Sequence, residues 1–154
     1  RNKEESIRVL LALIKEWGKT HNLMSRTGIQ QAHLHVEDSL SIAKKIKKQI
    51  IVDMGSGAGF PGIPLAISLP KKTFYLVESN KKKAAFLLHA INRLDLKNTT
   101  VVAERMESFS LQQEGVEIVS RAFGGIDESI NSAKNFLETK QKSFYHLYRR
   151  QAQY

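Results

Sequence analysis

A short apolar run leads directly into a glycine-rich turn in the first half of the chain. Ile50, Ile51 and Val52 are β-branched residues that favour a buried strand. Four glycines then occur within eight residues, in the segment Asp53-Met54-Gly55-Ser56-Gly57-Ala58-Gly59-Phe60-Pro61-Gly62. Glycines allow positive φ and let a ligand approach the backbone closely. A strand that ends in such a turn predicts an open α/β sheet with a ligand site beyond the carboxyl ends of its strands.

The chain after Gln49 alternates between β-branched runs and apolar residues at helical spacing. Helices are predicted over residues 84–94 and 127–137. Further strands are predicted over Thr73–Val77, Thr99–Ala103, Glu117–Ser120 and Phe144–Tyr148. Strands and helices that alternate in this way need crossover connections, which make neighbouring strands parallel. The predicted fold class is therefore α/β, with a Rossmann-like, doubly wound and mostly parallel sheet.

Residues 1–48 show a helical pattern instead. The first predicted helix carries its apolar residues on one face, namely Ile7, Leu10, Leu11, Ile14 and Trp17. Ser6 is its predicted N-cap and Gly18 its predicted end. A second helix is predicted from about Gln30 to Lys48. We expect one domain over residues 1–154, in which a helical N-terminal cap, 1–48, covers an α/β core, 49–154.

Basic residues outnumber acidic ones, 24 to 15, so the formal net charge is +9. Such a surplus favours a polyanionic partner, which can be RNA, DNA or an anionic membrane surface. The absence of cysteine excludes disulfides, thiolate zinc sites and cysteine nucleophiles. His33 and His35 have no evident third partner, so no metal site is predicted. The longest apolar stretch, Gly62 to Leu69, is too short to span a membrane, and we expect a cytoplasmic protein without membrane contact.

Two phosphate-binding motifs can be tested on the glycine-rich turn. A P-loop is excluded because Ile63, and not a lysine, follows Gly62. Gly57, Gly59 and Gly62 match the spacing of the dinucleotide-binding motif Gly-x-Gly-x-x-Gly. In that motif, however, the first glycine directly follows the strand, and here that place belongs to Gly55.

Charge provides a second test of the ligand. Asp53 at the strand end would oppose a pyrophosphate at the following helix N-terminus. The same carboxylate suits S-adenosylmethionine, which carries an ammonium and a sulfonium but no phosphate. Glu78 ends the second predicted strand, 25 residues later, where a carboxylate can bind both ribose hydroxyls of an adenosine ligand. NAD also contains this ribose, so an NAD(P)-dependent oxidoreductase stays open as the alternative.

The run from Asp53 to Ala66 closely resembles the signature of a bacterial family, the ribosomal RNA small-subunit methyltransferase G family, also called glucose-inhibited division protein B. Further segments agree with that family in order and spacing: Trp17 with Asn22-Leu23, His35-Val36-Glu37-Asp38-Ser39-Leu40, Arg105-Met106-Glu107 and Ser120-Arg121-Ala122-Phe123. The resemblance extends over roughly residues 10–137. It implies a class I methyltransferase fold with a closing pair of strands, which the sequence after Lys140 does not supply in full.

The resemblance also implies a reaction, the methylation of guanine N7 in 16S ribosomal RNA with S-adenosylmethionine. The substrate would be the RNA itself or the small ribosomal subunit, and we expect the protein to be a monomer. Carried over by position, Gly55 and Phe60 line the methionine end of the cofactor, and Arg121 lies near the transferred methyl group. Ribose and adenine are expected at Glu78, Ser79, Asn80, Met106 and Glu107. The predicted cofactor site consists of Asp53, Gly55, Ser56, Gly57, Gly59, Phe60, Glu78, Ser79, Asn80, Met106, Glu107 and Arg121.

Guanine N7 carries an exposed lone pair, so it needs no general base before it attacks a sulfonium methyl. We therefore assign no catalytic residue, and Arg121 is the candidate for positioning the reactants. Residues 1–77 hold 12 basic and 6 acidic residues, most of the surplus charge. RNA contacts are predicted for Arg26, Lys44, Lys45, Lys47, Lys48 and Arg105. A basic RNA-binding protein with a vestigial cofactor pocket is the second alternative, which methyl transfer would exclude.

Overall fold

The computed structural model describes residues 1–113, 115–121, 130, 131, 133, 134, 136 and 144–148. Its centre is a sheet of five parallel strands in the order β3-β2-β1-β4-β5. The strands are β1 (Ile50–Met54), β2 (Thr73–Val77), β3 (Thr99–Val102), β4 (Val116–Arg121) and β5 (Phe144–Tyr148). The predicted α/β, Rossmann-like sheet is confirmed.

The order of the strands creates a switch point beside β1. The chain first builds outward on one side, from β1 to β2 and β3, and then returns to place β4 on the other side of β1. Val52 of β1 is in register with Tyr75 of β2 and with Ile118 of β4. The loops that leave the carboxyl ends of β1 and β4 therefore diverge, and a crevice opens between them.

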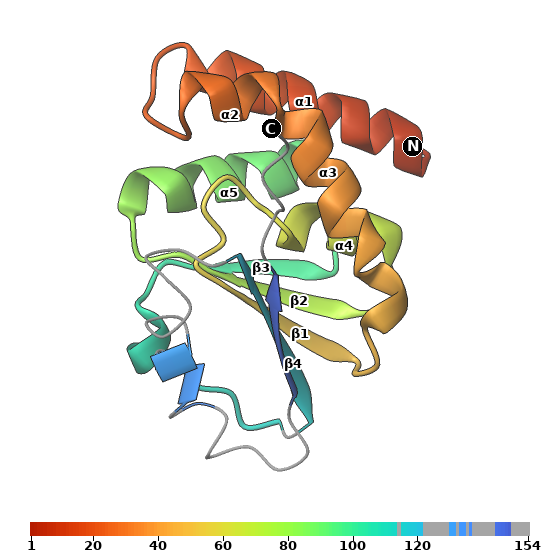
Figure 1. Ribbon diagram of the computed structural model, residues 1–154, viewed down its shortest axis with the longest axis vertical. Helices are drawn as coiled ribbons and strands as arrows, with labels where there is room; N and C mark the ends of the chain where they lie inside the picture. Colours follow the sequence, from red (N-terminus) through yellow and green to blue (C-terminus); the bar gives the residue numbers. More distant parts are fainter. Residues whose placement is uncertain (114, 122–129, 132, 135, 137–143, 149–154) are drawn as a thin grey trace.

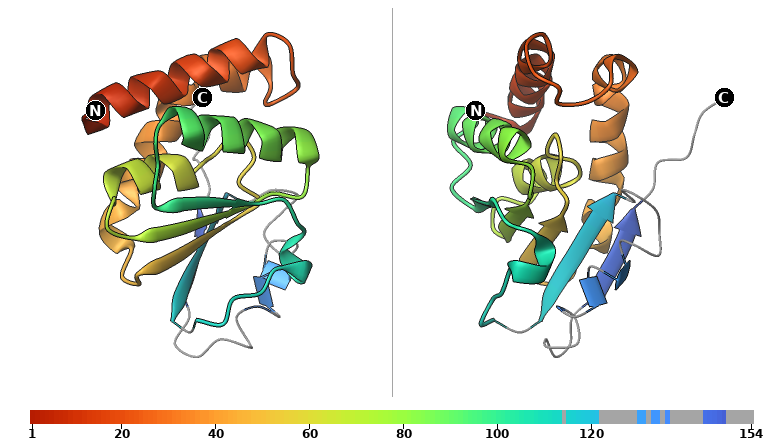
Figure 2. Two further views of the ribbon diagram at one scale, coloured as in Figure 1. Left: turned by 180° about the vertical axis from the view of Figure 1, so that it is seen from behind. Right: turned by 90° about the vertical axis from the view of Figure 1, so that its left-hand side faces the viewer.

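Five α-helices lie on one side of the sheet, and α1 is farthest from it (Figures 1 and 2). Their bounds are α1 (Lys3–Gly18), α2 (Arg26–Gln30), α3 (Ala32–Ser41), α4 (Gly62–Ser68) and α5 (Lys81–Arg93). Two short 3-10 helices complete the order, η1 (Ala43–Lys45) before β1 and η2 (Met106–Ser108) after β3. The helix predicted over residues 127–137 lies largely outside the described residues.

Apolar side chains fill both faces of the sheet. On the helical side, Leu10 and Ile14 of α1 pack into one cluster with Leu76 of β2 and Phe86 of α5. On the other side, a second cluster joins Val52, Met54, Val77, Met106, Phe109, Ile118 and Phe136. Because apolar side chains are buried on both faces of the sheet, its strands contain continuous apolar runs, as expected of a parallel sheet. No helix in the described ranges is long and apolar enough to cross a membrane.

Two predictions for the cap are wrong in detail. α1 begins at Lys3, because the Asn2 side chain accepts a hydrogen bond from the Glu5 N–H at 2.9 Å, whereas Ser6 is buried within the helix. Its predicted end at Gly18 is confirmed. The single helix predicted from Gln30 to Lys48 is broken into α3 and η1 and ends before Ile46.

The break before β1 has a specific cause. The backbone N–H groups of Lys47 and Lys48 donate to the carboxylate of Glu117, a fully buried residue of β4. These groups therefore have no helical carbonyl as partner. Ile46 takes an extended conformation and packs in a cluster with Ile51 of β1 and Phe74 of β2. A buried carboxylate from a distant strand thus decides where the cap ends and the sheet begins. The division of residues 1–154 into cap and core stays a prediction.

Candidate functional site

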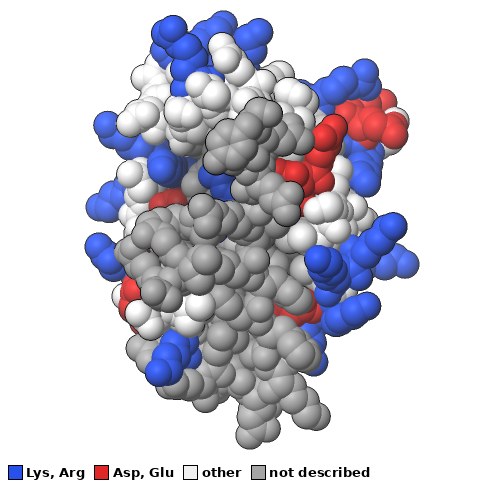
Figure 3. Space-filling model, viewed as in Figure 1, with Lys and Arg blue, Asp and Glu red and all other residues white. Residues whose placement is uncertain are grey.

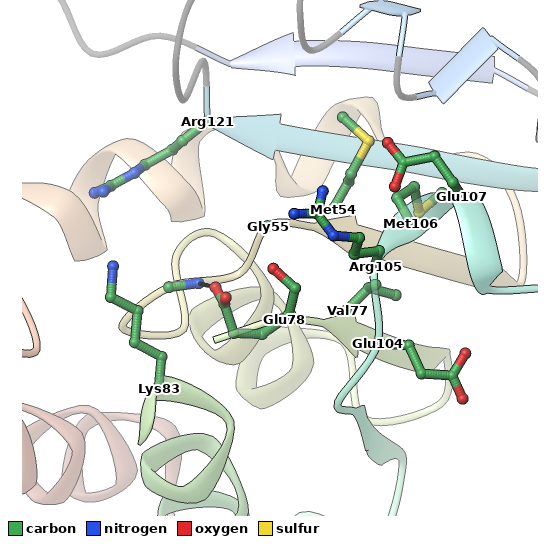
Figure 4. Close-up of a pocket in the computed structure, with 12 residues that line it drawn as sticks. Met54, Gly55, Val77, Glu78, Lys83, Glu104, Arg105, Met106, Glu107 and Arg121 are labelled. Carbon is green, nitrogen blue, oxygen red and sulfur yellow. Dashed lines mark hydrogen bonds between the residues drawn. The ribbon is translucent and has the colours of Figure 1, made fainter. Parts of the chain in front are cut away.

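A pocket of about 320 Å³ lies at the carboxyl ends of β1, β2 and β4 (Figure 4). This volume falls within the range of small-molecule sites in proteins. The pocket includes seven of the residues predicted to bind a cofactor, namely Gly55, Gly57, Glu78, Ser79, Met106, Glu107 and Arg121. It is also lined by Arg105, which was predicted to bind RNA, and by four residues outside the prediction, namely Met54, Val77, Lys83 and Glu104.

The glycine-rich loop is held against the neighbouring strand by its own backbone. The N–H groups of Gly55 and Ser56 donate to the carbonyl of Val77 at 2.9 and 3.1 Å. Gly55 and Gly57 have φ values of 69° and 59°, which side chains with a Cβ rarely adopt. Both glycines line the pocket with backbone that carries no side chain.

Asp53 lies beneath this loop and does not line the pocket. Its side chain is fully buried, and Oδ2 accepts hydrogen bonds from the Ser56 hydroxyl at 2.7 Å and from the Gly62 N–H at 2.9 Å. Oδ1 accepts no hydrogen bond from the part of the chain that the structure describes. Burial raises the pKa of Asp53 to about 7, although both hydrogen bonds and the charge of Arg121 act to lower it.

This position corrects the expectation that Asp53 faces the cationic groups of a ligand. The carboxylate instead acts as the N-terminal cap of α4, whose preceding residue, Pro61, provides no side-chain cap. The same hydrogen bond argues against the dinucleotide-binding interpretation of the turn. Because the Gly62 N–H at the start of α4 already donates to Asp53, it is not available to a pyrophosphate.

Glu78 presents a fixed carboxylate at the end of β2. Oε1 accepts the Gly57 N–H and Oε2 accepts the Asn80 N–H, both at 2.8 Å. Each oxygen has a second lone pair, so the carboxylate can accept further hydrogen bonds from a ligand in the pocket. Asn80 itself does not line the pocket, because its side chain accepts from the Lys83 N–H at 3.0 Å and caps α5.

Arg121 connects the pocket with the cap. Its Nη1 atom is 3.2 Å from Nδ1 of His35 on α3, and its guanidinium lies 6.0 Å from the ring centre of Phe60. The Phe60 and His35 rings are 5.5 Å apart, and Phe60 is buried. Phe60 therefore supports Arg121 from within and is absent from the residues that line the pocket. Ser56 and Gly59 likewise lie inside the loop.

Lys83 and Glu104 are the charged pocket residues that the sequence pattern missed, and Lys83 is the only cation of the two. Figure 4 shows its amine on the same side of the pocket as the Arg121 guanidinium, whereas Glu104 and Glu107 extend on the opposite side. The run Lys81-Lys82-Lys83 directly follows Asn80, the N-cap of α5. A usable signal was the position three residues after an N-cap, because that residue lies in the first helical turn beside the end of β2.

The residues predicted to contact RNA are separated by the fold. Arg105 lines the pocket and Arg26 is exposed on α2. The lysines between Ala43 and Gln49 precede β1, so they lie at the amino ends of the strands, on the edge opposite to the pocket. Within the described ranges, no three His, Cys, Asp or Glu side chains gather as metal ligands. The prediction of no metal stays a prediction.

A model of the GidB family, described as rRNA small subunit methyltransferase G, matches residues 3–152. This chain belongs to the GidB family. Curated relatives named ribosomal RNA small subunit methyltransferase G include one from Nitrosomonas europaea, 43% identical over 129 residues, and one from Coxiella burnetii (strain RSA 493 / Nine Mile phase I), 39% identical over 137 residues. These alignments cover 83% and 88% of this chain and 60% and 67% of the relatives. The GidB-family chain thus spans about three fifths to two thirds of their length.

Solved structures agree with the fold. The GidB-family chain is similar to the precorrin-6y C5,15-methyltransferase from Geobacter metallireducens GS-15, with a TM-score of 0.54, 17% identity, and coverage of 76% of this chain and 60% of that one. It is also similar to the 23S rRNA methyltransferase ErmE, with a TM-score of 0.54, 14% identity, and coverage of 80% and 45%. The family match does not favour the oxidoreductase alternative.

Proposed function

We propose that this chain binds S-adenosylmethionine in the pocket beside the glycine-rich loop and uses it to methylate guanine N7 in 16S ribosomal RNA. The observation that carries the proposal is the carboxylate of Glu78, anchored by two backbone N–H groups in a pocket that Val77 and Met106 also line. Membership of the GidB family supports the substrate class. Two further proposals follow from this reaction. The protein acts in the cytoplasm, and its partner is the small ribosomal subunit or the RNA of that subunit.

The residues that line the pocket fit such a ligand part by part. Glu78 would accept hydrogen bonds from the two ribose hydroxyls. Val77 and Met106 supply apolar surface for the adenine, and Glu107 supplies an acceptor for its amino group. Lys83, together with Arg121, would hold the carboxylate at the methionine end, because two cations on one side of a pocket favour an anion.

The chemistry demands orientation more than proton transfer. S-adenosylmethionine supplies an electrophilic methyl group, and guanine N7 supplies a lone pair in the plane of its ring. No proton leaves N7 before the transfer, so the residues of the chain have to hold the two groups in line and keep water out.

Calorimetric titration with S-adenosylhomocysteine tests the cofactor. We expect roughly micromolar binding to the wild-type chain, about tenfold or more weaker binding to Glu78→Gln, and no binding of NADH. Glu37→Gln, which changes an exposed glutamate of α3 outside the pocket, is the matched control and should bind as the wild type does. Binding of NADH instead of S-adenosylhomocysteine would overturn the proposal.

Transfer of a labelled methyl group to small-subunit RNA then tests the reaction. The label should appear in RNA and be recovered as 7-methylguanine after hydrolysis. A chain that binds S-adenosylhomocysteine but transfers no methyl group to RNA or to the small subunit would favour the RNA-binding alternative with a vestigial pocket.

A further inference from the structure

A second charged surface lies at the edge of the sheet opposite to the pocket. The fold brings together four lysines that precede β1 and two that precede β2, and we call them the amino-edge lysine patch: Lys44, Lys45, Lys47, Lys48, Lys71 and Lys72. The pairing of β1 with β2 creates this arrangement, because Ile50 is in register with Thr73. The sequence alone shows two separate basic runs, and only the parallel register places them side by side.

Direct contacts hold the two runs together. The Thr73 N–H donates to the Gln49 carbonyl at 2.9 Å, and the Lys72 amine donates to the Lys48 carbonyl at 2.7 Å. The Gln49 side-chain amide donates to the Lys71 carbonyl. These bonds use backbone acceptors and leave the ammonium charges of the patch in place.

Within the described residues, no aspartate or glutamate forms an ion pair with the exposed lysines of the patch, Lys44, Lys45, Lys47 and Lys71. The segments 43–49 and 70–73 contain no aspartate or glutamate. Glu117 faces the first segment from β4, but its side chain is fully buried and accepts the backbone N–H groups of Lys47 and Lys48. Farther along the edge, Asp95 forms an ion pair with Lys97 at 2.7 Å.

The exposed members of the patch point into solvent. Lys44, Lys45, Lys47 and Lys71 are exposed, whereas Lys48 and Lys72 are half-buried. Figure 3 shows basic side chains gathered on the right-hand side of the view, where the amino ends of β1 and β2 lie in Figure 1. Like charges held this close raise the energy of the isolated protein, and a polyanion relieves the repulsion.

We propose that the amino-edge lysine patch holds the phosphate backbone of a second segment of the RNA substrate, away from the guanine that enters the pocket. The proposal rests on the proposed function, which supplies an RNA partner. β1 has five residues, and at about 3.3 Å per residue it separates the two edges by about 15 Å. An RNA that touches both edges must therefore fold around the molecule, so the patch favours a structured RNA over a short single strand.

The test compares two variants with the same loss of charge. In the patch variant, the four exposed lysines are changed: Lys44→Gln, Lys45→Gln, Lys47→Gln and Lys71→Gln. In the control variant, four exposed basic residues elsewhere are changed: Lys3→Gln, Arg8→Gln, Lys15→Gln and Arg93→Gln. Binding of a 16S rRNA transcript and of a short single-stranded RNA is measured over a series of salt concentrations, beside calorimetry with S-adenosylhomocysteine.

We expect the patch variant to bind the transcript with a shallower dependence of log K on log salt, by about one unit for each lysine that contacts a phosphate. Its affinity for the short RNA and for S-adenosylhomocysteine should match the wild type. Equal slopes for the patch and control variants would overturn the proposal, and so would binding of the patch to vesicles with anionic lipid but not to RNA. Failure of the wild type to bind S-adenosylhomocysteine or to transfer a methyl group would instead count against the proposed function.

Discussion

The Nη1 atom of Arg121 lies 3.2 Å from Nδ1 of His35, and this contact joins the end of the central strand β4 to the cap helix α3. An arginine side chain has only donors, so Nδ1 of His35 must be the acceptor and the ring proton resides on Nε2. The cap therefore contacts the pocket through His35, which accepts a hydrogen bond from a guanidinium that lines the pocket.

Loss of this acceptor should affect the reaction more than the fold. His35→Ala removes the acceptor and the ring that packs against Phe60, so we expect kcat/KM for methyl transfer to fall about tenfold. His35→Asn, whose amide oxygen can accept from Arg121, should recover part of the loss. His33→Ala, an exposed neighbour on the same helix, is the control. Equal rates for the alanine variants at positions 33 and 35 would show that the contact does not position Arg121.

Two glycines with positive φ, Gly57 in the pocket loop and Gly115 directly before β4, allow a separation of stability from binding. Gly57 and Gly115 both have positive φ, 59° and 69°, and an added Cβ would have no heavy atom closer than 4.0 Å at either site. Gly57→Ala and Gly115→Ala should therefore lose a similar amount of stability, about 1–2 kcal/mol. Only Gly57→Ala should also weaken S-adenosylhomocysteine, because Gly57 lines the pocket and bonds to Glu78. Urea unfolding measures the stability of both variants, and calorimetry measures their affinity for S-adenosylhomocysteine. Equal affinities of the two variants would show that Gly57 does not contribute to the binding site.

Gly62→Ala should destabilise the protein more than Gly57→Ala or Gly115→Ala. A Cβ at this position would lie 2.5 Å from Oδ2 of Asp53 and would also collide with Leu76. Backbone and core would have to move, so we expect Gly62→Ala to cost about 2–3 kcal/mol or more and to disturb the whole loop. Thermal unfolding measures the loss, and a Tm close to that of Gly115→Ala would contradict the close packing of α4 on β1.

Local patterns predicted most of the sheet, because β-branched runs and glycines act within a few residues. The strand Thr73–Val77 was predicted with its observed bounds. Features that depend on distant partners were not accessible in this way. The end of the cap depends on Glu117 of β4, and the burial of Asp53 depends on where the start of α4 packs. A carboxylate at a strand end can face a ligand or cap a helix, and composition does not decide between these roles.

The proposed contact between Lys83 and the methionine carboxylate can be tested by changing either the residue or the ligand. Lys83→Ala should weaken S-adenosylhomocysteine about tenfold, because the methionine carboxylate would lose a charge-assisted hydrogen bond. Methylthioadenosine lacks that carboxylate and should bind the variant and the wild type equally. Lys82→Ala, the exposed neighbour outside the pocket, is the control for both ligands. A similar loss for both ligands would show that Lys83 supports the pocket without contacting the carboxylate.

The raised pKa of Asp53 makes stability depend on pH in a direction opposite to that of most carboxylates. In the folded chain this pKa is about 7, because burial penalises the charged form, whereas its ordinary value is 3.8. Between these values the folded state holds a proton that the unfolded state has released. The contribution of Asp53 to the free energy of unfolding is therefore greatest below about pH 4 and falls as the pH rises toward 7.

Asp53→Asn removes this titration and keeps an oxygen that can accept from Ser56 and Gly62. We expect the wild type to lose stability relative to this variant as the pH rises from 5 to 7, by up to about 3 kcal/mol. Asp95→Asn is the control, because Lys97 lowers the pKa of this exposed carboxyl and keeps it ionised over the whole interval. Urea unfolding at pH 5, 6, 7 and 8 gives the three curves. A constant difference between the wild type and Asp53→Asn would mean that Asp53 stays ionised beneath the loop, and the cap of α4 would then be a charged one.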